Sequence, residues 1–158
     1  MSSSVVYRWF RGKDELVAAC VTEALEGVVD ALEETLLIEP PVSPAEAVRR
    51  LLVATLQQTS HDGDDLTAVI VQAWAEAMRD PSVRDLLGAH YARIRDGLTE
   101  LVRRHQRAGT MPANLDPEAV ARPLFALIPG FIVQHLVLGA EGTGTYAAAA
   151  EQLLRVGA

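Results

Sequence analysis

The helical spacing of apolar residues restricts the fold of this chain more than any other feature. Between residues 65 and 79, apolar side chains stand three or four positions apart, which places them on one face of a helix. They are Leu66, Val69, Ile70, Ala73, Trp74 and Ala77. No run of the sequence alternates apolar and polar residues as a half-buried strand would. The pattern therefore predicts an all-α fold.

Proline and capping residues mark where the helices begin. In Ser43-Pro44-Ala45-Glu46, a hydroxyl cap precedes a first-turn proline, and a glutamate three residues after the cap completes a capping box. Asp80-Pro81 and Asp116-Pro117 repeat the cap and proline. The sequence predicts helices over residues 13–37, 43–60, 65–79, 81–108, 117–139 and 145–156.

Length and composition favour one intracellular domain. The chain has 158 residues, within the usual size of a single domain. It contains no uninterrupted apolar run long enough for a membrane span and no apolar signal-peptide core after Met1, so we expect a cytoplasmic location. Cys20 is the single cysteine, and its apolar neighbours favour a buried structural thiol.

Charge is divided unequally along the chain. The net charge is −7, which disfavours general coating of nucleic acid. Residues 1–13 nevertheless contain Arg8, Arg11 and Lys13 and no acidic side chain, a local charge of +3. The other 145 residues carry 11 arginines against 21 acids, a net −10. The N-terminal segment is the part expected to attract a phosphate backbone.

The stretch VVYRWFRGKDELVAAC resembles the end of the DNA-binding motif in the tetracycline-repressor (TetR) family of transcriptional regulators. An apolar pair, a tyrosine, a phenylalanine, a basic turn and an acidic helix start follow at the family's offsets. These positions are held by Val5, Val6, Tyr7, Phe10, Lys13, Glu15 and Leu16. Residues 73–139 are similar to the looser pattern of the family's C-terminal regulatory domains.

This resemblance implies long antiparallel helices forming a TetR-like regulatory domain over residues 14–158, with the end of a helix-turn-helix in residues 1–13. Ser2, Ser3, Ser4 and Val5 would face base edges, and Tyr7 and Lys13 would contact phosphates. Because the printed chain begins within the recognition helix, we expect it to bind operator DNA weakly or not at all. The complete protein would bind an operator.

The resemblance also implies a small-molecule cavity among the middle helices and a homodimer through the last two. The candidate ligand residues are Trp74, Met78, Tyr91, Ile94, Phe125, Phe131, Gln134 and His135. Plain core packing is the alternative for each apolar member. Helix 117–139 is apolar nearly all round, which favours burial on more than one side. Pro129 is predicted to kink that helix and bulge the cavity wall near Trp74 and Tyr91.

Other functional classes find less support. No nucleophile elbow, phosphate loop or His-Glu metal motif occurs, so neither an enzyme nor a cofactor is predicted. His90 and His105 have no ligand-like spacing and are expected to be ordinary surface or packing residues. The sequence thus predicts a ligand-responsive transcriptional regulator, with repression as the expected mode. The alternatives are a stand-alone ligand-binding or dimer-forming remnant and, further removed, an enzyme.

Overall fold

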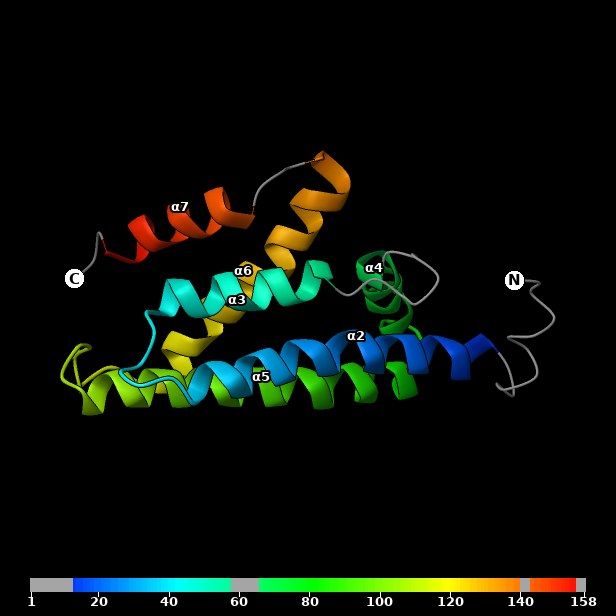
Figure 1. The fold of residues 1–158 in the computed structure, drawn as a ribbon. Coiled ribbons are helices and arrows are strands. Elements are labelled where there is room, and N and C mark those ends of the chain that lie inside the picture. The colour runs from blue at the N-terminus through cyan, green and yellow to red at the C-terminus, as the bar shows by residue number, and fades with distance from the viewer. Residues whose placement is uncertain (1–12, 58–65, 140–142, 156–158) are drawn as a thin grey trace.

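The computed structural model describes residues 13–57, 66–139 and 143–155, and these residues contain helices and no strand, which confirms the all-α prediction (Figure 1). In chain order the helices are α2 (Lys13–Leu36), α3 (Pro44–Gln57), α4 (Leu66–Ala77), α5 (Pro81–Arg107), α6 (Pro117–Leu138) and α7 (Thr143–Arg155). The long helices α2 and α5 lie side by side, α3 packs on α2, and α6 packs on α5. Helix α7 lies along α3, and α4 packs against α2 and α5.

The caps predicted from the sequence form at three helix starts. The Asp80 carboxylate accepts a hydrogen bond from the Ser82 amide at 2.8 Å, and Asp116 accepts one from the Glu118 amide at 3.1 Å. The Ser43 hydroxyl likewise accepts from the Glu46 amide at 3.1 Å. Each bond satisfies one amide that has no partner inside its helix.

The second half of the predicted capping box does not form. Instead of reaching back to the Ser43 amide, the Glu46 carboxylate pairs with Arg49 at 2.6 Å and Arg50 at 2.9 Å. Arg49 binds both carboxylate oxygens of Glu46, and a bidentate pair of this kind adds a second charge-assisted bond that a single amide cannot supply. The hydrogen bond from Arg49 is the main cause that lowers the pKa of Glu46.

Arg104 of α5 holds the C-terminal end of α2. Its guanidinium donates hydrogen bonds to the Leu36 carbonyl and, at 2.8 Å, to the Ile38 carbonyl, and it pairs with the Glu39 carboxylate. Only 10% of the Arg104 side chain is exposed. The last carbonyls of a helix have no partner within the helix, so Arg104 supplies partners at this end and fixes it to α5.

The core lies between the helices as two groups of buried side chains. The larger joins α2, α3, α5 and α6 around Leu32, Leu51, Leu98 and Phe131. The smaller joins α2, α4 and α5 around Val21, Ile70 and Leu87. Trp74 and Tyr91 pack against both groups. Cys20, predicted to be buried, is half-buried at the edge of the smaller group because it lies beside the α2 face rather than at its centre.

Two glycines of α5 meet opposite surroundings, and this leads to a prediction. A Cβ at Gly97 would lie 2.9 Å from Cγ of the buried Leu32, whereas a Cβ at Gly88 would meet nothing within 4 Å. Alanine favours a helix over glycine by about 1 kcal/mol, and overpacking costs about 1–3 kcal/mol. We expect Gly88→Ala to raise the free energy of unfolding in urea by about 0.5–1 kcal/mol.

The matched variant Gly97→Ala has the same helix preference but crowds Leu32. Its free energy of unfolding is expected to fall by about 1 kcal/mol, because the overpacking cost exceeds the helical gain. Equal effects at the two positions would show that the close packing of α5 on α2 is not what determines the outcome.

Candidate functional site

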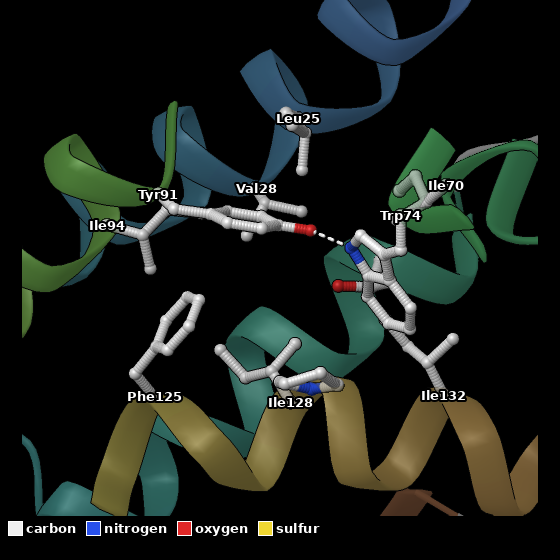
Figure 2. A pocket seen from close by; sticks show the side chains of 11 residues that line it. Leu25, Val28, Ile70, Trp74, Tyr91, Ile94, Phe125, Ile128 and Ile132 are labelled. Carbon is white, nitrogen blue, oxygen red and sulfur yellow. Dashed lines mark hydrogen bonds between the residues drawn. The ribbon is translucent and has the colours of Figure 1, made fainter. Parts of the chain in front are cut away.

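A central pocket lies where five helices meet (Figure 2). The space between its walls totals about 350 Å³ when the gaps between atoms and the part open to solvent are counted, but only about 20 Å³ of it can hold the centre of a water molecule, so the pocket is narrow and partly open. Helices α2, α3, α4, α5 and α6 all contribute to its wall. The lining residues are Leu25, Val28, Thr55, Ile70, Trp74, Tyr91, Ile94, Phe125, Ile128, Pro129 and Ile132.

Helical spacing explains why these side chains converge. Residues three, four and seven positions apart share a helix face. On α6 this spacing brings together Phe125, Ile128, Pro129 and Ile132. In Figure 2, Phe125, Ile128 and Ile132 lie across the pocket from Tyr91. The other helices each contribute one residue or a pair to the rest of the wall.

The polar groups of the wall are few. The Trp74 indole N–H donates a hydrogen bond to the Tyr91 hydroxyl, which points toward it in Figure 2. The rings of Tyr91 and Phe125 pack edge to face with their centroids 5.3 Å apart. The Thr55 hydroxyl donates to the Leu51 carbonyl at 2.8 Å. Within the part of the chain that the structure describes, the Tyr91 phenol is the one ionisable side chain that lines the pocket, and burial raises the pKa of that phenol.

Four of the eight candidate ligand residues meet in this pocket, namely Trp74, Tyr91, Ile94 and Phe125. The other four lie elsewhere among the described residues.

Met78 lies just beyond the end of α4, and 78% of it is exposed. Gln134 is exposed on α6 and donates to the Gly130 carbonyl at 3.3 Å. Phe131 is buried on another face of α6, where its ring stacks against His135 at 5.8 Å and meets Tyr146 of α7 edge to face at 5.0 Å. Phe131 and His135 therefore belong to the packing of α6 and α7, away from the pocket.

Several lining residues were not among the candidates. The α6 residues Ile128 and Ile132 share the spacing of Phe125 and could have been found from that pattern. Ile70 lies one turn before Trp74 on the predicted apolar face of residues 65–79 and could have been found in the same way. Leu25, Val28 and Thr55 had no distinguishing signal, because only the packing of α2 and α3 turns them inward. Pro129 lines the pocket together with Trp74 and Tyr91, and α6 continues through it to Leu138; the kink itself stays a prediction.

The candidate DNA-contacting residues fall largely outside the part of the chain that the structure describes. Ser2, Ser3, Ser4, Val5 and Tyr7 all precede its first described residue. Lys13 is the first residue of α2. The assignment of all six therefore rests on the sequence.

Both histidines of α5 have packing roles. His90 is buried and lies within 3.0 Å of the Leu86 carbonyl and 3.3 Å of the Glu26 carboxylate. His105 is buried between the Val42 carbonyl at 2.8 Å and the Thr110 hydroxyl at 2.7 Å. Within residues 13–57, 66–139 and 143–155, no three His, Cys, Asp or Glu side chains are grouped as metal ligands would be.

An all-α molecule built around an interhelical apolar pocket has the form of a helical regulatory domain. Residues 44–156 match the family model described as "BetI-type transcriptional repressor, C-terminal". The chain belongs to the TetR family of transcriptional regulators, which are non-enzymatic transcription factors.

Solved structures share the fold at low sequence identity. A TetR family regulator, PfmR, from Thermus thermophilus is 22% identical, with a TM-score of 0.73 over 97% of this chain and 80% of that one. Salmonella enterica GusR is 24% identical, with a TM-score of 0.70 over 98% and 77%. A TetR regulator from Haloarcula marismortui is 22% identical, with a TM-score of 0.71 over 96% and 78%. No curated protein sequence matches significantly.

Proposed function

We propose that this protein is a ligand-responsive repressor in which a small molecule in the central pocket controls binding to operator DNA. The observation that carries the proposal is the position of α2. This helix supplies Leu25 and Val28 to the pocket wall, and it starts at Lys13, directly after the basic N-terminal segment. A molecule in the pocket therefore contacts the helix that leads to the proposed DNA-binding residues.

A ligand can shift such a protein only if it binds one conformation more tightly than the other. The pocket wall is shared by five helices, so its shape depends on how α2 sits against α4, α5 and α6. A conformation with α2 displaced would offer a ligand a different cavity. We propose that this difference in affinity couples the regulatory domain, residues 14–158, to the DNA-binding segment, residues 1–13.

The DNA-binding part of the proposal rests on the N-terminal charge. Residues 1–13 carry +3 while the rest of the chain carries −10, so phosphates would be attracted to that segment alone. Lys13 is proposed to contact a phosphate, and residues 2–5 to face bases. A regulator of this kind acts on DNA in the cytoplasm, which agrees with the soluble character of the family.

We further propose a homodimer formed through α6 and α7. Ala126, Val133 and Val137 lie on one exposed stripe of α6, which we name the α6 outer face; Val137 is 71% exposed. Helix α6 is apolar and long enough to cross a membrane by length and composition, with only 28% of its most apolar window buried within this subunit. Members of the TetR family are generally dimeric, and a second copy would cover this surface.

Exposed and mostly small residues on α7 support the same homodimer interface. Thr145, Ala148, Ala149 and Gln152 are exposed at helical spacing, so they form a second stripe. Short side chains let another helix approach closely. Contiguous apolar patches that are exposed to solvent on a single subunit mark sites of interaction with a partner.

Disruption of the gene in its host tests the proposed function. If the protein represses, transcripts of its target genes should rise in the disrupted strain and return to their original level with a wild-type copy. A Lys13→Glu copy should fail to restore repression, because it reverses the charge proposed to meet phosphate.

Arg103→Glu provides the matched control for that copy. Arg103 is an exposed arginine of α5, far along the chain from the N-terminal segment, and the same change of charge there should leave repression intact. Unchanged transcripts on disruption, or full repression by Lys13→Glu, would contradict the proposed function.

A further inference from the structure

The hydrogen-bond donors of the central pocket are almost all used within the protein. Thr55, Trp74 and Tyr91 provide the polar side-chain groups of its wall. The Thr55 hydroxyl gives its proton to the Leu51 carbonyl, and the Trp74 indole gives its one N–H to Tyr91. Neither group has a proton left to donate to a molecule in the pocket.

The Tyr91 hydroxyl is the exception. Its oxygen accepts the bond from Trp74, and no acceptor within the described residues takes its own proton. Burial raises the pKa of this phenol above its ordinary value of 10.0, so it keeps the proton at neutral pH. A buried donor without a partner is costly. The pocket thus contains one donor that a bound molecule can satisfy.

The wall provides nothing to balance a charge. Asp, Glu, Lys, Arg and His are all missing from the described residues that line the pocket, and a charge transferred to such surroundings is strongly disfavoured. Aromatic walls can bind a cation through their ring faces. Here, however, Tyr91 and Phe125 pack edge to face on each other, and no carboxylate accompanies them. The surroundings favour a neutral occupant.

We propose that the central pocket binds a compact, uncharged and largely apolar molecule whose one acceptor oxygen receives the hydrogen bond of the Tyr91 hydroxyl. This inference rests on the proposed ligand-responsive function and names the class of ligand. The aliphatic side chains of Leu25 and Val28 on α2 and of Ile128 and Ile132 on α6 line the pocket (Figure 2) and would contact the apolar body of the molecule.

Two pairs of probes of matched shape test the inference by calorimetric titration of the full chain. Acetophenone and isopropenylbenzene differ only in C=O against C=CH₂. We expect acetophenone to bind about tenfold more tightly, the effect of one buried hydrogen bond.

The second pair tests the charge of the ligand: tert-butylbenzene and trimethylphenylammonium differ in a central carbon against N⁺. We expect the neutral member to bind at least about tenfold more tightly.

Two tyrosine variants test whether Tyr91 causes the preference for acetophenone over isopropenylbenzene. Tyr91→Phe also removes the acceptor of the Trp74 indole, so the informative quantity is the ratio of the two affinities rather than either affinity. That ratio should fall from about ten to one or below, because the buried carbonyl of acetophenone then has no donor. Tyr146→Phe is the control, since its hydroxyl donates to the Leu127 carbonyl outside the pocket, and it should keep the tenfold preference.

Equal binding of acetophenone and isopropenylbenzene by the wild-type chain would overturn the assignment of Tyr91. So would a preference that survives Tyr91→Phe. Tighter binding of trimethylphenylammonium would overturn the neutral class, and failure of all four probes to bind would overturn the inference as a whole. None of these results changes the transcripts measured after gene disruption, so the proposed repressor function succeeds or fails separately.

Discussion

Phe131→Ala is expected to lower the free energy of unfolding by about 3–5 kcal/mol, the largest effect of any single change considered. Phe131 is 1% exposed, and its ring meets both His135 of the same helix and Tyr146 of α7. Removing it leaves a cavity and takes away a ring contact between α6 and α7. Urea unfolding followed by circular dichroism measures the loss.

Phe125→Ala is the matched control on the same helix. Phe125 is only partly buried and already borders the empty space of the pocket, so its removal creates less new cavity. We expect it to cost less stability than Phe131→Ala but to change the binding of the aromatic probes, because it enlarges the pocket. A smaller loss for Phe131→Ala than for Phe125→Ala would contradict this account of the core.

The double variant Val133→Arg/Val137→Arg is expected to convert the proposed dimer into a monomer, with the dissociation constant raised more than about a hundredfold. Both valines belong to the α6 outer face. In a twofold dimer each substitution occurs twice in one interface, and each buried arginine without a partner is costly. Sedimentation equilibrium at micromolar concentrations measures the change.

Leu37→Arg/Met78→Arg is the control for surface charge. Leu37 is 81% exposed and Met78 is 78% exposed, and neither belongs to α6 or α7. This variant gains the same two positive charges and should remain dimeric. A stable wild-type monomer, or a dimer that survives the valine changes, would place the contact between subunits elsewhere or remove it.

Sequence patterns were sufficient for the helices because the relevant signals are local. Asp80-Pro81 and Asp116-Pro117 begin α5 and α6 where the cap and the first-turn proline predict. The positions of the helix ends are predicted less accurately. The pattern extends α4 to residue 79, but the helix ends at Ala77. Helix α7 starts at Thr143 instead of residue 145. At such ends the last turn competes with local alternatives, which a periodic pattern does not resolve.

The pocket was only half predictable because it depends on which helix faces meet. Phe125 and Phe131 are both large, aromatic and on α6, but six residues turn the helix by about 240°, so they cannot face the same space. Phe125 lines the pocket and Phe131 packs under α7. The α2 residues Leu25 and Val28 look like any other apolar stripe until α4 and α6 are in place.

The bonds from Arg104 to the end of α2 give that helix the mechanics of a lever. The fulcrum is at Leu36 to Glu39, where α2 is held to α5, and a pocket ligand would push at Val28, about 12 Å along the axis. Lys13 lies about 35 Å from the same fulcrum. If α2 moves as a rigid rod, a shift of any size at Val28 becomes about three times larger at Lys13. A small molecule bound in the pocket would therefore displace the basic N-terminal end of α2 more than any other part of that helix.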